Sequence, residues 1–154
     1  MAEEGKKAPD FTLPSDDGRT IQLSKLKGGP VVVYFYPKDD TSGCTTEAKD
    51  FTCLVDEFAK AKVTVIGISP DSVASHQKFK KKHGLAVTLA ADEDKAAAEA
   101  YGVWVEKSMY GKKYMGVERS TFLIDKSGKI AKSWRKVKVP GHAEEVLAAA
   151  KALG

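Results

Sequence analysis

Residues 30–37, PVVVYFYP, limit the fold of this chain more than any other stretch of the sequence. The run between the two prolines is entirely apolar or aromatic and begins with three valines, a residue type that is frequent in strands. A strand with apolar side chains on both sides must be covered on both faces, which is typical of a central strand in a mostly parallel sheet. The run therefore predicts an α/β protein with helices on both faces of its sheet.

The remainder of the chain alternates between predicted helices and predicted strands. Helical spacing of apolar residues or a terminal glycine predicts helices at 41–62, 72–84, 93–102 and 141–154. Apolar runs predict two further buried strands, at 63–69 and 86–92. Alternating segments separated by turn residues predict a hairpin within 11–28 and another within 120–137. The glycine-punctuated segment 102–119 is expected to be irregular.

Size and composition fit one compact domain, which we place at residues 1–154. No apolar run approaches the roughly 18 residues of a transmembrane helix, and residues 1–11 lack the apolar centre of a signal peptide. We therefore expect a cytoplasmic protein with no membrane partner. The lysine-rich run 78–84 reads as a solvated helix face. No nucleic-acid motif accompanies the net charge of +4, so we expect no nucleic-acid partner.

One of the two cysteines lies where the strand predicted at 30–37 leads into the next helix. A thiol attacks as its thiolate, and a free cysteine has a pKa of about 8.5. Cys44 falls in the first turn of that helix, where unpaired backbone N–H groups and the helix dipole favour an anion. This turn follows the carboxyl end of a sheet strand, the usual place for a site in an open α/β fold. These features indicate a reactive cysteine.

A purely structural role for Cys44 is the alternative, because a buried free cysteine often behaves as a small apolar residue. At 100° per residue, Cys44 lies within about 20° of Phe51 around the helix and therefore points towards the core. We expect a half-buried thiol at a helix N-terminus, flanked by Thr41 and Ser42. That setting favours the functional role.

The residues around Cys44 resemble the peroxiredoxin signature. In YPKDDTSGCTTE, three residues separate Pro37 from Thr41 and two separate Thr41 from Cys44, while the later segment ERSTFLID supplies Arg119. The stretches FYPKDDTSGCT, VIGISPDSVASHQKF and APDFTLPSDDG resemble the bacterioferritin comigratory protein, or peroxiredoxin Q, branch of that family. The resemblance extends from Ala8 to the final helix and covers nearly the whole chain.

This resemblance implies a thioredoxin-like fold, with a central mixed sheet, helices on both faces and an N-terminal β-hairpin extension. It implies a thiol-dependent peroxidase that reduces hydrogen peroxide and organic hydroperoxides in antioxidant defence. Cys44 would become a sulfenic acid and be recycled by thioredoxin or another thiol, without a cofactor or a metal. Because the branch is often monomeric, we expect a monomer or a weak dimer.

The resemblance also assigns roles that suit the side chains of the motif. Arg119 supplies planar donors that can bind both the thiolate and a peroxide, and it does not lose its proton. The hydroxyl of Thr41 can accept one hydrogen bond while donating another, which would orient the hydroperoxide beside the sulfur. Pro37 would rigidify the turn and shield the thiolate from water. Glu47 resembles a family position that helps to orient the arginine.

Each of these residues also has a plain structural explanation. Arg119 can be a solvent-facing arginine at a strand start, Thr41 a helix cap and Pro37 the end of a strand. Glu47 can be a favourable acid near a helix N-terminus. Taken together with Cys44, the pattern favours the catalytic roles of Arg119, Thr41 and Pro37, while both explanations of Glu47 stay open.

The sequence departs from the branch in its second cysteine. The position five residues after Cys44 is Lys49, and segment 79–82 of the next helix contains no cysteine. Cys53 lies about 180° around the helix from Cys44 and roughly 13–14 Å along it, whereas a disulfide needs Cα atoms within about 7 Å. Three roles stay open for Cys53: none in catalysis, a resolving thiol after local unfolding, or pairing with another subunit or protein. Without resolution by Cys53, an external thiol must attack the sulfenic acid.

Functions of other classes receive less support from the sequence. A thioredoxin-type dithiol enzyme needs Cys-x-x-Cys, but position 47 is glutamate. His76, His83 and His142 are scattered without a spacing that would bind metal, and we expect the first two to be solvated. A non-enzymatic thioredoxin-like module, such as a redox sensor, a holdase or a partner-binding domain, is the alternative to the peroxidase.

Overall fold

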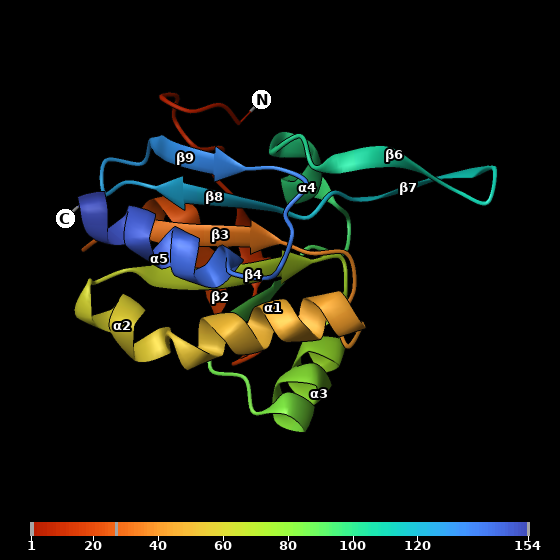
Figure 1. Ribbon diagram of the computed structural model, residues 1–154, viewed down its shortest axis with the longest axis horizontal. Helices are drawn as coiled ribbons and strands as arrows, with labels where there is room; N and C mark the ends of the chain where they lie inside the picture. Colours follow the sequence, from red (N-terminus) through yellow and green to blue (C-terminus); the bar gives the residue numbers. More distant parts are fainter. Residues whose placement is uncertain (1, 27, 154) are drawn as a thin grey trace.

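The computed structural model describes residues 2–26 and 28–153, and its centre is a five-stranded sheet in the order β5-β4-β3-β8-β9 (Figure 1). The strands are β3 (Val31–Phe35), β4 (Thr64–Ser69), β5 (Thr88–Ala91), β8 (Ser120–Ile124) and β9 (Ile130–Trp134). Strands β3, β4 and β5 run parallel, whereas β8 pairs antiparallel with β3, and β9 with β8. The prediction of a mixed central sheet is therefore confirmed.

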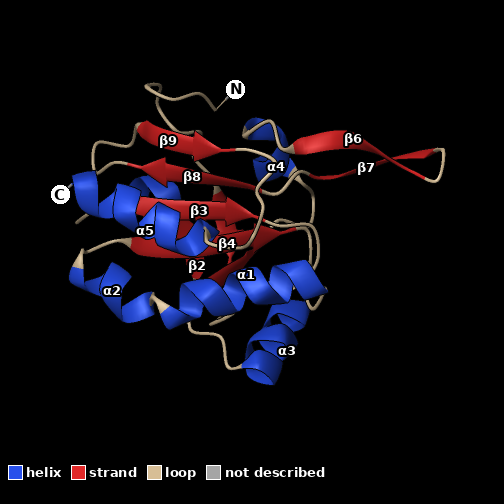
Figure 2. Cartoon of the chain, in the orientation of Figure 1, coloured by secondary structure: helices blue, strands red, loops and turns tan. Residues whose placement is uncertain are grey.

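Helices lie on both faces of this sheet, as predicted (Figure 2). One face carries α1 (Ser42–Cys53), α2 (Val55–Lys60), α3 (Val73–His83) and α5 (His142–Leu153). The other carries α4 (Ala96–Ala100), the 3-10 helix η1 (Leu23–Lys25) and the predicted N-terminal hairpin of β1 (Thr12–Pro14) and β2 (Thr20–Gln22). Because both faces are covered, every residue of β3 is buried, which accounts for its uninterrupted apolar sequence.

The prediction of an irregular segment at 102–119 is wrong. Strands β6 (Trp104–Met109) and β7 (Lys112–Val117) form an antiparallel hairpin that extends away from the central sheet (Figure 1). Met109 pairs with Lys112, so the turn contains only Tyr110 and Gly111, both with positive φ, 53° and 77°. Two such residues in succession suit a two-residue hairpin turn, and the glycine adopts that conformation without steric cost.

The helix predicted at 41–62 is divided in two. At Leu54 the backbone has φ −101° and ψ 5°, which separates α1 from α2. Phe51 of α1 and Phe58 of α2 still pack together, with ring centroids 5.9 Å apart. Since both helices direct their aromatic side chains into the same core, the apolar spacing continues across the break and does not reveal it.

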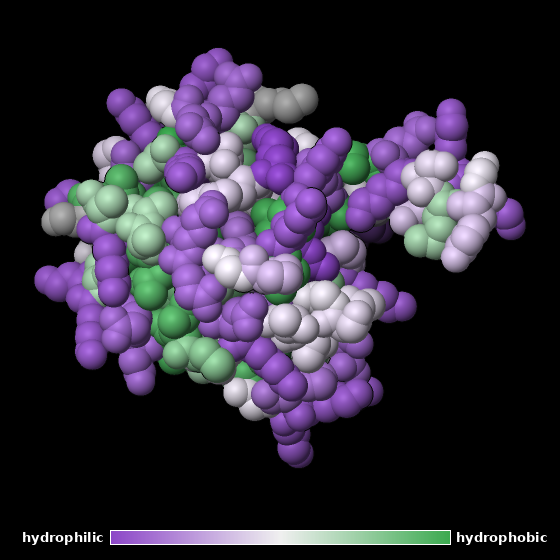
Figure 3. All heavy atoms as spheres, viewed as in Figure 1, coloured by the Kyte–Doolittle hydropathy of each residue, from purple (hydrophilic) through white to green (hydrophobic). Residues whose placement is uncertain are grey.

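The surface seen in Figure 3 is largely hydrophilic, with apolar side chains in scattered patches. Within residues 2–26 and 28–153, no helix combines the length and the apolar character needed to span a membrane.

The pairing of β3 with β8 brings two distant parts of the chain together at the carboxyl end of β3. Phe35, the last residue of β3, pairs with Ser120, the first residue of β8. Arg119 therefore stands beside the turn that leads from β3 into α1. Its carbonyl oxygen accepts a hydrogen bond from the backbone N–H of Val137 at 3.0 Å, which holds this part of the backbone in place.

Candidate active site

Cys44 and Arg119 form the centre of the site, although 75 positions separate them in the sequence. The Nη2 atom of Arg119 donates a hydrogen bond to the Sγ atom of Cys44 at 3.2 Å. Cys44 is only 1% exposed, so it points into the core as predicted but is more deeply buried than the expected half-buried thiol. The sulfur is therefore in hydrogen-bond contact with a permanent positive charge at a position that is almost closed to solvent.

The helix start adds to this electrostatic effect. Cys44 is the third residue of α1, and the first backbone hydrogen bond of the helix runs from Thr45 N–H to the Thr41 carbonyl at 2.8 Å. The N–H groups before Thr45 belong to the first turn, where the helix itself supplies no acceptor. They and the positive end of the helix dipole favour an anion at Sγ.

Glu47 contacts the other side of the guanidinium group. It lies one turn after Cys44 on α1, and its Oε1 atom accepts from Nη1 of Arg119 at 2.6 Å. At 1% exposure, Glu47 differs from a surface acid placed near a helix end. Of the two explanations open from the sequence, the geometry favours orientation of the arginine, because Glu47 and Cys44 together fix both ends of its planar head.

The environment of Glu47 changes its protonation. Burial raises the pKa of this carboxyl from 4.5 to about 7, while the charge and hydrogen bond of Arg119 act in the opposite direction. Its Oε2 atom is buried and has no hydrogen-bond partner among the described residues, which adds to the cost of ionisation.

The raised pKa of Glu47 predicts a pH-dependent contribution to stability. The folded protein binds this proton more tightly than the unfolded chain, so the contribution is complete below pH 4.5 and is lost as the pH rises through about 7. Glu47→Gln has no such proton. We expect the free energy of unfolding of the wild type, relative to that of the variant, to be lower at about pH 8 than at about pH 5 in denaturant unfolding. A difference that does not change with pH would contradict the raised pKa.

Thr41 and Pro37 flank the loop that leads into α1. Thr41 precedes α1 with an extended backbone, φ −86° and ψ 156°, but its side chain makes no capping hydrogen bond within the described part of the chain. Instead, Oγ1 donates to the carbonyl oxygen of Lys38 at 2.9 Å. Because the hydroxyl proton is engaged there, the lone pairs of Oγ1 can accept a hydrogen bond from a peroxide. Thr41 is exposed and Pro37 is half-buried, so both can border an approaching substrate.

Cys53 lies apart from this group. It is the last residue of α1, at the end opposite Cys44, and it is exposed, as its helix phase predicts. The intact helix between the two cysteines keeps them about 13–14 Å apart along its axis, too far for a disulfide.

The expectation that His76 is solvated is wrong, because this side chain is completely buried. Its Nδ1 atom lies 2.8 Å from Oδ2 of Asp39, which is itself buried. The lysines around His76 suggested a solvated helix, but His76 lies three positions before the buried Phe79 and shares its face of α3. That spacing was the signal available in the sequence.

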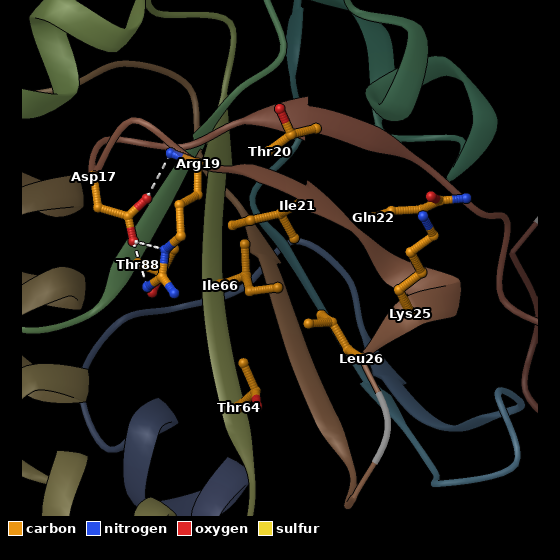
Figure 4. A pocket seen from close by; sticks show the side chains of 10 residues that line it. All are labelled: Asp17, Arg19, Thr20, Ile21, Gln22, Lys25, Leu26, Thr64, Ile66 and Thr88. Carbon is orange, nitrogen blue, oxygen red and sulfur yellow. Dashed lines mark hydrogen bonds and ion pairs between the residues drawn. The ribbon is translucent and has the colours of Figure 1, made fainter.

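A cavity of about 380 Å³ lies away from these residues (Figure 4). Its lining includes Ile21 of β2 and Ile66 of β4, which belong to the core on the face opposite Cys44. The cavity therefore does not serve the Cys44 site. Within residues 2–26 and 28–153, no group of three or more His, Cys, Asp or Glu side chains is arranged to hold a metal ion.

Gly43 gives a test of the arginine position. A Cβ atom at this residue would lie 3.1 Å from Nη2 of Arg119, so Gly43→Ala should displace the guanidinium that contacts Cys44. We expect kcat/KM for hydrogen peroxide to fall about 10-fold, since misplacement of a positioned group slows the reaction. Thermal unfolding should show a Tm close to that of the wild type, because the helix propensity of alanine opposes the disturbance of the contact between Arg119 and Glu47. A lower Tm with unchanged activity would contradict this explanation.

Comparisons with known proteins identify the family of the chain. The model of the AhpC/TSA family matches residues 5–133. The chain belongs to this family. It is 54% identical over 145 residues to putative peroxiredoxin bcp of Coxiella burnetii, covering 94% of this chain and 96% of that protein. It is also 54% identical to peroxiredoxin Bcp of Bacillus subtilis, with 94% and 92% covered.

A solved structure of the Xanthomonas campestris bacterioferritin comigratory protein superposes with a TM-score of 0.91 at 46% identity, covering 97% of this chain and 98% of that one. The fold is thus the thioredoxin-like fold of the peroxiredoxins, as expected. The chain is a peroxiredoxin of the Bcp type, and its activity is that of a thiol peroxidase.

Proposed function

We propose that this peroxiredoxin reduces hydrogen peroxide and organic hydroperoxides, with Cys44 as the nucleophile and Thr41, Arg119 and Pro37 around the substrate. The contact of 3.2 Å between Arg119 Nη2 and Cys44 Sγ at the start of α1 carries this proposal. The Xanthomonas campestris relative is described as having alkyl peroxide reduction activity, which supports the inclusion of organic hydroperoxides. The role in the cell is antioxidant defence.

The residues suit a single displacement step. The thiolate of Cys44 attacks the terminal O–H oxygen of the hydroperoxide, so that an S–O bond forms while the O–O bond breaks. Thr41 accepts from the O–H group and orients it, and Arg119 stabilises the negative charge that develops on the leaving oxygen. Cys44 becomes a sulfenic acid, and the leaving oxygen takes a proton from solvent to depart as water or an alcohol.

The second half of the cycle uses an external thiol, which we assign to thioredoxin or a thiol of similar function in the cytoplasm. A thiolate of the reductant attacks the sulfenic sulfur and releases water, and the resulting mixed disulfide is then reduced by a second thiol. The separation of Cys53 from Cys44 along α1 supports an external reductant. We propose that residues 1–154 act as one domain, as a monomer or a weak dimer.

One equivalent of hydrogen peroxide tests the proposal. The reduced protein is oxidised, its remaining thiols are blocked under denaturing conditions, and the intact mass is measured. We expect a sulfenic acid on Cys44, trapped by a sulfenic-acid reagent, with Cys53 alkylated. A peptide linking Cys44 to Cys53 would instead make Cys53 the resolving thiol. A folded protein that shows neither product would favour the non-enzymatic module.

A further inference from the structure

A buried polar network joins the loop before α1 to helix α3. At its centre is Asp39, whose side chain is only 4% exposed. Oδ1 of Asp39 accepts from the hydroxyl of Tyr36 at 2.6 Å, and Oδ2 accepts from the hydroxyl of Ser75 at 2.8 Å. Nδ1 of His76 lies 2.8 Å from the same Oδ2 atom. Two elements that are more than 30 residues apart in the sequence are thus tied together by one carboxylate.

The second ring nitrogen of His76 also has a partner. Nε2 lies 2.9 Å from the carbonyl oxygen of Ala90, which can only accept a hydrogen bond. Nδ1 faces the Asp39 carboxyl group, so both ring nitrogens are engaged in the buried network. Loss of either side chain leaves buried polar atoms without their hydrogen bonds, so the pair resists separation.

A second set of contacts, which is exposed, connects Asp40, the next residue of the loop, to the same helix α3. Oδ1 of Asp40 lies 2.7 Å from Nε2 of His83, and Oδ2 accepts from Nζ of Lys82 at 2.7 Å. His83 follows His76 by seven positions, which places both on one face of α3. Because the Asp40 carboxylate faces solvent, this outer pair contributes little by itself and offers a matched control.

We propose that Asp39 and His76 are positioning residues for peroxide reduction, and that their buried pair holds the loop in the conformation in which Thr41 receives the substrate. The connection is short, because Thr41 donates its proton to the carbonyl of Lys38, which is bonded directly to Asp39. A shift of Asp39 moves this carbonyl and releases the Thr41 hydroxyl from its orientation. The inference rests on the substrate role of Thr41 within the proposed function.

Cys44 and Arg119 are held by other contacts, namely α1 itself and the pairing of β3 with β8. The pair should therefore affect the reaction with peroxide more than the general reactivity of the thiolate. Two rate constants separate these effects: oxidation of Cys44 by hydrogen peroxide, and alkylation of Cys44 by iodoacetamide, which needs no orientation by Thr41. Both are measured in a Cys53→Ser background, so that only one thiol reacts.

We expect Asp39→Asn and His76→Gln each to slow oxidation about 10- to 100-fold while alkylation changes by less than about 3-fold. His83→Gln should change neither rate by more than about 2-fold. In a Thr41→Val background, which is itself slow, the loss caused by Asp39→Asn should nearly disappear, since both changes remove the same function. Ser75→Ala, which removes one donor to Asp39, provides a milder change if Asp39→Asn and His76→Gln do not fold.

Three results would overturn the inference. The first is an unchanged rate of oxidation in folded Asp39→Asn and His76→Gln variants, and the second is an equal fall in the rates of oxidation and alkylation. The third is an effect of Asp39→Asn on oxidation that is as large in the Thr41→Val background as it is without that change. If Thr41→Val itself oxidised normally, the proposed role of Thr41 would fail, which is a separate outcome. A slow Thr41→Val protein together with normal Asp39 and His76 variants would refute the positioning role alone.

Discussion

Cys44→Ser is expected to abolish peroxide consumption. Serine lacks the polarizable sulfur that attacks the peroxide and forms the sulfenic acid, and its hydroxyl does not ionise near neutral pH. Hydrogen peroxide removal in the presence of excess dithiothreitol measures this directly, since a small thiol supplies the electrons without a partner protein. The expected rate is that of the buffer with dithiothreitol alone.

Cys53→Ser is the matched control, because it removes the only other thiol and leaves the Arg119 contact intact. With dithiothreitol as reductant, its activity should stay within about 2-fold of the wild type, as expected for an exposed side chain outside the site. Consumption by Cys44→Ser above the background rate would place the nucleophile elsewhere. Circular dichroism of both variants establishes that they are folded.

Arg119→Met is expected to have the second-largest effect. The substitution removes the cation that contacts Cys44 Sγ and that stabilises the leaving oxygen in the proposed reaction. Loss of a donor that acts on the developing charge typically slows a reaction about 100- to 1000-fold, and we expect a fall of that size in kcat/KM for hydrogen peroxide. Arg119→Lys should be nearly as slow, because one ammonium group does not reproduce the planar fork that contacts both Cys44 and Glu47.

The same substitution also leaves Glu47 buried without its partner. Because the pKa of Glu47 is about 7 even beside Arg119, loss of the arginine keeps this carboxyl protonated at neutral pH, and the loss of stability should grow as the pH rises above about 7. The double variant Arg119→Met/Glu47→Gln separates the two consequences. In denaturant unfolding at about pH 8 it should recover most of the lost stability, because no buried acid remains, but it should stay as slow as Arg119→Met. Recovery of activity together with stability would show that the arginine acts only through the fold.

Much of the fold follows from local patterns in the sequence. The apolar run that became β3 predicts a strand covered on both faces, since neither side can face water. Gly84, which follows α3, has φ 62° and marks the helix end as predicted. The hairpin β6–β7 was not predicted. Its turn is formed by Tyr110 and Gly111, and a tyrosine with positive φ is uncommon in such turns.

For the site, the sequence by itself determined the residue types and their local placement. The spacing of Pro37, Thr41 and Cys44 sets the thiol in the first turn of a helix directly after a buried strand, because the signals that end a strand and start a helix lie in neighbouring residues. The resemblance to the peroxiredoxins then added Arg119, for which no local pattern in the sequence gives a reason.

Only the tertiary structure decided which groups meet. The register of β3 with β8 brings Arg119 to Cys44 and Glu47, and the packing of α3 buries His76 against Asp39. Periodicity shows that a residue faces the core but not which residue it meets there, because partners from distant segments are chosen by strand pairing and side-chain packing. The burial that raises the pKa of Glu47 and keeps the His76–Asp39 pair from water therefore exists only in the folded chain.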